Sequence, residues 1–301
     1  MKKNCKICHS NKDVEIVCKL DDSNIDRFKS FSLLKYNSYL DQFVNNDFEI
    51  SISYCKNCKF YWYTNMPSDT ELTGMYANSN SINTKLITKE SDKKINKNNL
   101  LLKRILQTFF SITNFTDYPK SKIRLLDFGS GSGEFSRIAL QNGLLVTAFD
   151  PSLNRNTLKN NEDISYYDNI NDLAENYFDI IILNQVLEHV PNPMETLSLL
   201  NKLGKKDVLI YIAVPNINTS HEGKNIWKEW PYNNKNIHTM APFEHLNGFT
   251  PFAFRKIINK SGFKVLPIKN KLNFSIRYAL IDQVFSLLNL YGTTQALIIK
   301  Q

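Results

Sequence analysis

The chain has 301 residues, of which 42% are hydrophobic and 22% are charged, and its formal net charge is +8. This composition is ordinary for a globular protein with a sizeable core, and the length suits one large domain or a medium domain with a smaller one. The basic excess would suit phosphate-bearing partners. However, the lysines are scattered among asparagines and serines, which is typical of a solvated surface and does not indicate a nucleic-acid-binding block.

The N-terminus runs directly into a cysteine motif without the apolar segment of a signal peptide. No apolar stretch approaches the ~20 residues that are needed to span a bilayer. Four of the five cysteines form two close pairs, which indicates metal ligation in a reducing compartment and not a disulfide framework. We therefore expect a cytoplasmic protein.

Residues 1–66 contain every cysteine and several short β-like aromatic runs, such as residues 60–63. Each cysteine pair has the Cys-x-x-Cys spacing, which places two thiolates on one turn so that two turns can share a tetrahedral metal ion. The four residues are Cys5, Cys8, Cys55 and Cys58. A closed site of four cysteines predicts structural zinc and hence a small zinc-binding lobe, because such a site contributes folding energy and needs no redox chemistry.

Alternatives to zinc stay open for the two cysteine pairs. An iron–sulfur cluster is the main metal competitor, and a disulfide-exchange motif is a further reading of Cys-x-x-Cys. His9 could replace one of the four ligands, whereas Cys18 is expected to be buried or incidental.

Residues 67–122 are expected to connect this lobe to a larger domain. The first half of the connector is polar and rich in turn-forming residues. In the second half, apolar residues recur at helical spacing, which predicts a helix that packs on the following sheet and not a membrane helix. These residues are Leu101, Leu102, Ile105, Leu106, Phe109 and Phe110.

In residues 123–301 strand and helix patterns alternate, which predicts a parallel sheet with crossover helices. Strands are expected at residues 123–128, 144–149, 164–167, 178–183, 208–214, 263–268 and 294–299. Helices are expected at residues 134–141, 153–159, 194–203 and 251–260. The aperiodic residues 217–248 form a long loop, which in a compact domain is usually functional or a lid.

The most informative stretch is residues 125–135. An apolar run reaches Asp127, and Gly129, Gly131 and Gly133 follow at alternate positions before a helical pattern opens. That order indicates a buried strand, a tight turn that can approach a ligand closely, and a helix N-terminus. A dinucleotide-binding fingerprint would place its third glycine one residue later, where Glu134 stands. The stretch instead resembles the first motif of class I S-adenosylmethionine-dependent methyltransferases.

Four further segments resemble motifs of the same family in the same order, namely residues 148–150, 178–181, 187–190 and 245–250. The resemblance covers roughly residues 120–300 and implies an α/β fold. This fold has a seven-stranded Rossmann-like methyltransferase sheet, here preceded by the small N-terminal zinc-binding, β-rich lobe. It also implies S-adenosylmethionine as the cofactor.

The residues of these motifs have physical roles in cofactor binding. Asp127 can orient the glycine loop or accept from the ammonium group of the ligand, and Asp150 can accept both ribose hydroxyls. Asp168, after the third strand, is a candidate for the adenine edge, and Asn184, after the fourth strand, is expected near the cofactor. The expected cofactor-binding residues are Asp127, Gly129, Ser130, Gly131, Gly133, Asp150, Asp168 and Asn184.

A Cys-x-x-Cys pair at each end of an N-terminal segment, followed by this core, resembles the C-methyltransferases that act on nucleotide-linked deoxysugars. In that family the zinc lobe closes over the substrate and a Glu–His pair after strand five lies at the sugar, a pair that Glu244 and His245 match. The chain differs at Phe243, where the family often has a second His, and in a reduced tyrosine-rich stretch around Tyr76. We also expect no counterpart of the family's additional C-terminal domain.

Methyl transfer from a sulfonium is an in-line displacement, so a base is needed only for a hydroxyl or an activated carbon. His245 is the first candidate for this base, and Glu244 could orient its ring or bind a sugar hydroxyl. His189 is the second candidate base, although the Glu188–His189 segment could equally be a structural turn. Three aromatic residues could line the acceptor pocket or pack in a lid, namely Tyr76, Trp227 and Trp230.

The sequence therefore predicts a methyltransferase that acts on a small molecule, most simply a nucleotide-linked sugar or a polysaccharide precursor. Two alternatives stay open: an RNA methyltransferase with a zinc-bearing recognition lobe, and a non-catalytic methyltransferase-like binding protein. The Asn-Pro-Pro-Tyr-type sequence of base N-methylating enzymes is replaced by residues 184–187, so no nucleic-acid partner is expected. The acceptor atom and the oligomeric state are left undetermined by the sequence.

Overall fold

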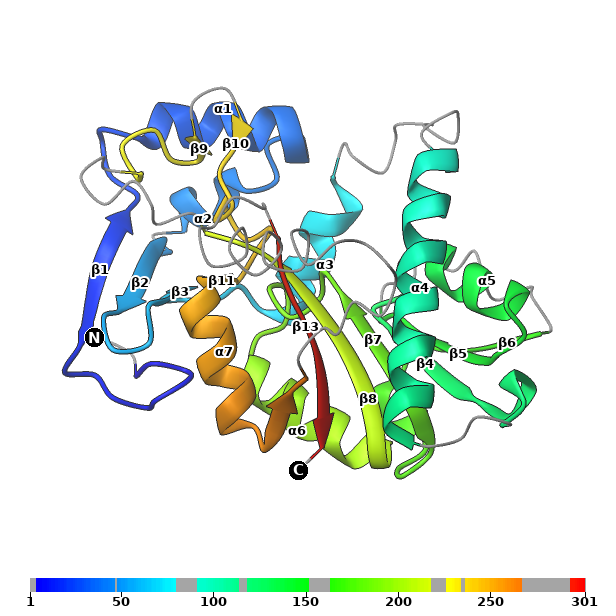
Figure 1. Cartoon of the computed structure of the whole chain (residues 1–301). Coiled ribbons are helices and arrows are strands. Elements are labelled where there is room, and N and C mark those ends of the chain that lie inside the picture. Colours follow the sequence, from blue (N-terminus) through cyan, green and yellow to red (C-terminus); the bar gives the residue numbers. More distant parts are fainter. Residues whose placement is uncertain are drawn as a thin grey trace.

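The computed structural model describes residues 4–46, 48–79, 91–113, 118–151, 163–217, 226–233, 236–266 and 293–300. Two sheets organise this part of the chain, one of seven strands and one of four, and a short two-stranded ribbon accompanies them (Figure 1). The seven-stranded sheet and its helices follow the N-terminal lobe in the sequence, but both contribute to one hydrophobic core.

The large sheet has the strand order β12-β13-β8-β7-β4-β5-β6. Its strands are β4 (Arg124–Phe128), β5 (Leu145–Phe149), β6 (Ile164–Tyr167), β7 (Phe178–Asn184), β8 (Gly204–Pro215), β12 (Phe263–Val265) and β13 (Thr293–Lys300). The five strands from β8 to β6 run parallel, whereas β13 is antiparallel to both of its neighbours. The expected seven-stranded Rossmann-like sheet is confirmed, with β13 reversed within it.

Helices cover both faces of this sheet (Figure 1). They are α4 (Ser91–Thr113), α5 (Glu134–Gln141), α6 (Pro193–Leu203) and α7 (Pro251–Lys260), with short 3-10 turns η2 (Lys120–Lys122) and η4 (Ile170–Asp172). Because successive residues of a strand face opposite sides, Leu125 packs with α4 and α5, whereas Leu126 packs with α6 and α7. The helix expected at residues 153–159 lies outside the described residues.

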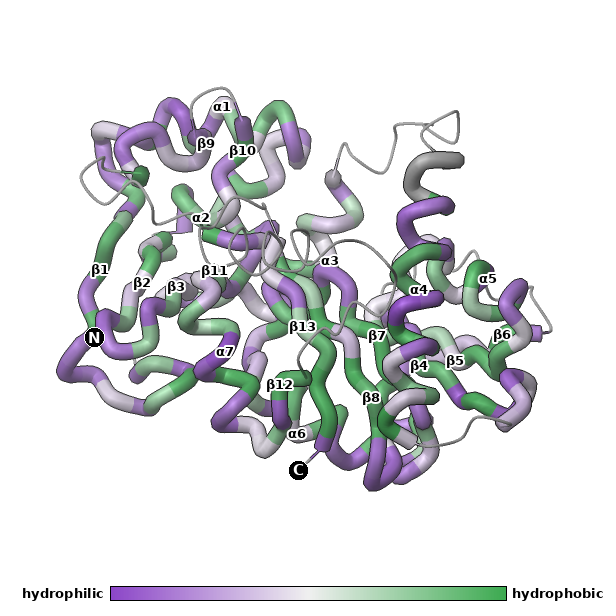
Figure 2. Tube along the Cα trace, viewed as in Figure 1, coloured by the Kyte–Doolittle hydropathy of each residue, from purple (hydrophilic) through white to green (hydrophobic). Residues whose placement is uncertain are grey.

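The helix expected in the connector is present as α4. Its side chains at Leu102, Ile105, Leu106 and Phe109 are buried against the sheet, as their helical spacing predicts. Figure 2 shows hydrophobic residues along the central strands that these helices cover, with hydrophilic residues gathered at helix surfaces and strand ends. No helix among the described residues is long and apolar enough to cross a membrane.

The N-terminal lobe is a four-stranded antiparallel sheet with three helices. Its elements are β1 (Val14–Lys19), α1 (Ile25–Tyr36), α2 (Asp41–Asn45), β2 (Ser51–Cys55), β3 (Phe60–Tyr63), α3 (Asp69–Ala77) and β11 (Asn247–Phe249). The last strand comes from far along the chain and pairs with β3, with Asn247 opposite Trp62. The long loop after β8 is thereby built into the lobe, and its described parts include the ribbon β9 (Tyr232–Asn233) and β10 (Asn236–Ile237).

Helix α1 was not apparent in the sequence, although its buried residues have regular helical spacing. Phe28, Phe31 and Tyr36 face the lobe core. Leu33 and Leu34, in the same helix, are 60% and 64% exposed. Two exposed leucines on the polar face obscure the amphipathic pattern by which such a helix would be recognised.

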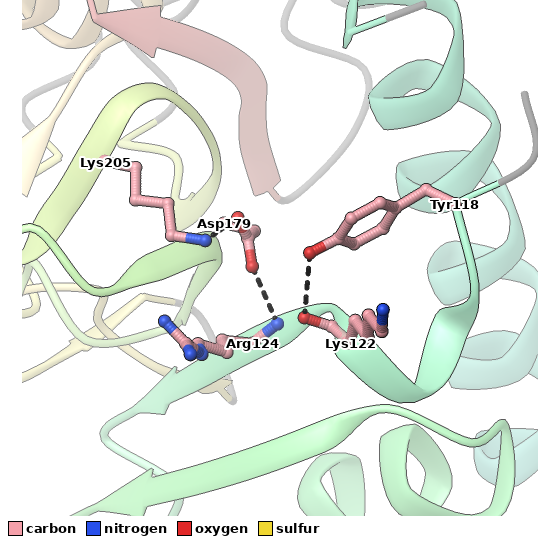
Figure 3. A network of polar contacts seen from close by, with 5 residues as sticks. All are labelled: Tyr118, Lys122, Arg124, Asp179 and Lys205. Atoms are coloured by element: carbon pink, nitrogen blue, oxygen red, sulfur yellow. Dashed lines mark hydrogen bonds and ion pairs between the residues drawn. The ribbon is translucent and has the colours of Figure 1, made fainter. Parts of the chain in front are cut away.

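A polar network joins the amino ends of three central strands, at the opposite end of these strands from the glycine loop (Figure 3). The carboxylate of Asp179 accepts the backbone N–H of Arg124 at 2.9 Å and the ammonium of Lys205 at 2.6 Å. The Arg124 guanidinium lies over the ring of Tyr177, 4.2 Å from its centroid. Asp179 therefore joins the beginnings of β4, β7 and β8, which is a structural role for this motif residue.

Candidate functional site

The expected cofactor-binding residues all lie at the carboxyl ends of neighbouring parallel strands. Asp127 is the last residue but one of β4, and the glycine loop follows that strand directly. Asp150 follows β5, Asp168 follows β6, and Asn184 is the last residue of β7. This edge of an open α/β sheet is where such folds bind ligands.

The glycine loop adopts a backbone that only glycine adopts without strain. Gly129, Gly131 and Gly133 have φ values of 77°, 54° and 73°. The N–H groups of Gly129 and Ser130 donate to the carbonyl of Phe149 at 2.7 and 2.9 Å, which ties the loop to the end of β5. The loop therefore turns tightly above the sheet and presents the first turn of α5 to the same edge.

Val186 sets the space around the first glycine. A Cβ atom on Gly129 would lie 2.5 Å from Cγ2 of Val186, in the segment that follows β7. The loop after β4 and the segment after β7 thus approach each other closely, which requires glycine at this position.

One carboxylate accepts a hydrogen bond from the loop, and a second accepts one from the helix that follows it. Asp150 accepts the N–H of Gly131 at 2.7 Å, and Asp127 accepts the hydroxyl of Ser136 in α5 at 2.6 Å. Burial raises the pKa of Asp127 to about 6. Asp127 therefore orients α5, whereas Asp150 fixes the loop from the end of β5. Asp168 is half-buried and Asn184 is exposed.

Three ionisable side chains meet after β7 and before β11. Glu188, His189 and His245 have ligand-type atoms within 4.8 Å of one another. Nε2 of His189 lies 3.8 Å from Oε1 of Glu188, and the rings of His189 and His245 are edge to face with centroids 4.8 Å apart. The structure therefore brings the two histidines expected from the sequence together, although they are far apart in the chain.

Burial sets the charge states in this cluster. The side chain of Glu188 is 1% exposed, and neither of its oxygens has a hydrogen-bond partner among the described residues. Burial raises the pKa of Glu188 to about 8, and burial lowers the pKa of His245. Near neutral pH the carboxyl is therefore protonated and the imidazole of His245 is neutral.

The tautomer of His245 follows from its hydrogen bond. Its Nδ1 lies 2.7 Å from the carbonyl oxygen of Thr239. Because a carbonyl can only accept, Nδ1 carries the hydrogen and Nε2 keeps its lone pair. Such an imidazole can accept a proton from an acceptor group or bind a metal ion.

Glu244 lies among aromatic residues of the lobe. Burial raises the pKa of Tyr36, and the negative charge of Glu244 raises it further. Phe243, which precedes Glu244, is fully buried against Phe43 with ring centroids 5.0 Å apart. Phe243 is therefore a core residue of the lobe.

The two tryptophans of the long loop differ in their contacts. Trp230 is 1% exposed and donates its indole N–H to the carbonyl of Met240 at 2.7 Å, so it is a packing residue of the lobe. Trp227 is partly buried and lies against the rings of Tyr61 and His238, with centroids 5.5 and 4.7 Å away.

The four paired cysteines form a single cluster. Their Sγ atoms lie within 4.8 Å of one another, and those of Cys8 and Cys55 are 3.8 Å apart. Tetrahedral coordination with metal–sulfur bonds of about 2.3 Å would separate the sulfurs by about 3.8 Å, so the cluster could hold a metal ion. His9 is exposed and outside the cluster, and Cys18 is buried elsewhere, in β1.

Sequence reasoning missed three residues that connect these groups. Glu188 lies in a motif segment but was not assigned a role, although a carboxylate that directly follows two apolar residues after a strand is a signal for a buried ionisable group. Lys6 and Asn247 join the cysteine cluster to the histidine-bearing segments. No local sequence pattern marks the latter two, because their partners are distant in the chain.

Comparison with solved structures finds similar methyltransferases. The chain is similar to an S-adenosylmethionine-dependent methyltransferase from Archaeoglobus fulgidus, with 21% identity, TM-score 0.40, and coverage of 65% of this chain and 94% of the other. It is also similar to the plantazolicin methyltransferase BamL, with 17% identity, TM-score 0.47, and coverage of 70% and 87%. A third similar structure is a methyltransferase in complex with the Trm112 methyltransferase activator of Haloferax volcanii. It has 16% identity, a TM-score of 0.42, and coverage of 69% of this chain and 94% of the other.

A search of curated proteins gives no significant match. The sequence model of a methyltransferase domain family matches residues 97–268, more than half of the 301 residues. That match spans the glycine loop, the carboxylates at the strand ends and both histidine-bearing segments. The chain therefore belongs to the methyltransferase domain family, and its seven-stranded sheet is the Rossmann-like sheet expected of that family.

Proposed function

We propose that this protein transfers the methyl group of S-adenosylmethionine to a small molecule, most simply a nucleotide-linked sugar or a polysaccharide precursor. The observation that carries the proposal is the meeting of His189 and His245 beside Glu188, on a segment whose Val186 lies against the glycine loop. The glycine loop and Asp150 would bind the methyl donor, and the two histidines would contact the acceptor.

The cofactor would lie along the carboxyl edge of the sheet. Asp150 would accept the ribose hydroxyls, while Gly129, Gly131 and Gly133 let the backbone approach the methionine and ribose portions without a Cβ in the way. Asp168 would contact the adenine edge, and Asn184 would lie near the cofactor. Ser130 and Asp127 complete this proposed set, the latter by orienting the loop through Ser136.

His245 would act as the base. Its Nε2 takes the proton of an acceptor hydroxyl or activated carbon as that atom attacks the methyl carbon. When bound, S-adenosylmethionine would supply the methyl group to the acceptor atom, with S-adenosylhomocysteine as the other product. Glu244 would orient the acceptor through a hydroxyl group, and His189 would support or replace His245. A neutral Glu188 beside them avoids placing an uncompensated negative charge in a buried position.

The cysteine cluster would bind zinc as a structural ion. Four thiolates form a closed donor set that leaves no open position for chemistry, and Zn²⁺ prefers this tetrahedral sulfur environment. Burial raises the pKa of Cys58 to about 12, so a metal ion is needed to keep such thiols ionised near neutral pH. Cys5, Cys8 and Cys55 supply the other ligands.

The proposal is tested by incubating the purified protein with methyl-labelled S-adenosylmethionine and a panel of nucleotide-linked sugars, with products read by mass spectrometry. A mass increase of one methyl group on a sugar supports it, and fragmentation assigns the label to carbon or oxygen. Total RNA is included as a parallel acceptor. Label in RNA alone would refute the small-molecule assignment.

A further inference from the structure

A lysine from the first cysteine pair reaches the segment that carries His189. Lys6 lies between Cys5 and Cys8, and its Nζ donates to the carbonyl of Pro191 at 2.9 Å and to Oδ1 of Asn247 at 3.0 Å. A hydrogen bond from an ammonium group is stronger than one between neutral partners. The metal-binding turn is therefore joined directly to two distant segments.

Asn247 extends this connection. Its Nδ2 donates to the carbonyl of Val190 at 2.7 Å, and its backbone N–H donates to the carbonyl of Glu188 at 3.0 Å. Asn247 is 1% exposed, so these bonds are shielded from water. Together with Lys6, it holds the backbone carbonyls of Glu188, Val190 and Pro191, three of the four residues from 188 to 191.

The same asparagine fixes the second histidine. Asn247 is the first residue of β11, two positions after His245, and β11 pairs with β3 of the lobe. The segments that carry the two histidines are hydrogen-bonded to each other through Asn247. Their rings are 4.8 Å apart, so a small shift of either segment changes their relative orientation.

We infer that Lys6 is a positioning residue, which links the metal-binding turn to the Glu188–Pro191 and β11 segments and so sets the orientation of His189 relative to His245. The effect on turnover rests on the proposed function, but the effect on the two imidazoles does not. Displacement of reacting groups by about 1 Å costs about 100-fold in rate, so loss of this link reduces turnover without removing a reacting group.

A second lysine provides a matched control. Lys260, in α7, donates to the carbonyl of Ile7 at 3.1 Å and so binds the same cysteine turn. It has no contact with residues 188–191 or with Asn247 among the hydrogen bonds of the described residues. Lys260→Met therefore removes an ammonium contact to the metal-binding turn while leaving the link to the histidines in place.

The test compares Lys6→Met with Lys260→Met in the full-length, metal-loaded protein. Metal content is measured by elemental analysis, and the imidazoles by NMR of histidine-labelled protein, with resonances assigned through His189→Gln and His245→Gln. Both lysine variants should keep the metal. The His189 and His245 resonances should shift in Lys6→Met and stay unchanged in Lys260→Met, and Lys6→Arg should return them toward the wild-type positions.

Turnover provides the second arm. In Lys6→Met we expect kcat to fall about 10- to 100-fold while the KM for S-adenosylmethionine stays within about twofold, and Lys260→Met to retain wild-type kcat. If Lys6→Met does not fold, Lys6→Gln takes its place. Unchanged imidazole resonances in the Lys6 variant, or equal shifts in both variants, would overturn the inference. Absence of methyl transfer by the wild type would refute the proposed function. The NMR comparison would still decide whether Lys6 positions the two histidines.

Discussion

The carboxylate of Asp150 accepts a hydrogen bond from the backbone N–H of Gly131 at 2.7 Å. This bond crosses from the loop after β4 to the end of β5, so the residue proposed to hold the ribose also fixes the loop proposed to hold the methionine portion. A preorganised loop loses less conformational entropy when the ligand binds. The glycine loop and Asp150 therefore act as one unit.

Gly129→Ala should abolish or strongly weaken S-adenosylmethionine binding. The alanine Cβ would lie 2.5 Å from Cγ2 of Val186, and φ at this position is 77°, which an L-residue rarely adopts. The loop must therefore shift. We expect calorimetry to show at least about a tenfold loss of affinity, which corresponds to about 1.4 kcal/mol.

Gly143→Ala is the control for that variant. Gly143 has a similar φ of 84°, but a Cβ there would meet nothing within 4 Å. Its effect should be limited to backbone strain of about 1 kcal/mol in the free energy of unfolding, with cofactor affinity unchanged. Equal cofactor affinities in the two variants would show that contact with Val186 does not constrain the loop.

His238 should make the protein less stable as the pH falls. Burial lowers the pKa of His238 to about 4, below its value of about 6.5 in an unfolded chain. Between these two pH values the unfolded state therefore binds more protons than the folded state. The contribution of neutral His238 to the free energy of unfolding is complete above pH 6.5 and is lost as the pH falls toward 4. The loss reaches about 3 kcal/mol in the free energy of unfolding.

The measurement is urea unfolding at several pH values for the wild type and for His238→Asn, whose side-chain oxygen can still accept the N–H of Met240 as Nδ1 does now. The variant should lose part of the stability decrease between pH 6.5 and 4. Identical pH profiles for wild type and His238→Asn would contradict this assignment.

Metal removal should unfold the N-terminal lobe and disturb the remaining domain. Cys5, Cys55 and Cys58 are fully buried, and their side chains share one core with strands of the large sheet. Metal binding to such a site supplies folding energy. Elemental analysis should find one zinc per chain, and chelation should lower the thermal midpoint. Iron in place of zinc, or no metal in folded protein, would refute the zinc proposal.

His245→Ala should eliminate turnover while leaving S-adenosylmethionine affinity nearly unchanged, because the imidazole is proposed to act only on the acceptor. Loss of a general base costs about 100- to 10,000-fold in rate. His189→Ala should have a smaller effect. Single-turnover assays separate the chemical step from binding, and wild-type turnover in His245→Ala would remove this residue from the mechanism.

Strands β4 and β5 could be predicted from the sequence because each is a short apolar run with an aspartate, Asp127 or Asp150, at or beside its end. Helix α4 could be predicted because its apolar residues recur at helical spacing. The cysteine pairs likewise indicate their cluster through local spacing. What could not be predicted depends on distant partners. The pairing of Asn247 with Trp62, the reach of Lys6 to Pro191 and the reversed direction of β13 arise only in the folded chain.

The central claim, that the carboxyl edge of the large sheet is an S-adenosylmethionine site, is tested most directly by titration calorimetry with S-adenosylmethionine. The wild type should bind one molecule per chain. Asp150→Ala should bind at least about 10-fold more weakly, since hydrogen bonds to a charged group contribute about 1.5 to 3 kcal/mol. No binding by folded wild type, or equal affinity in the two proteins, would contradict this account.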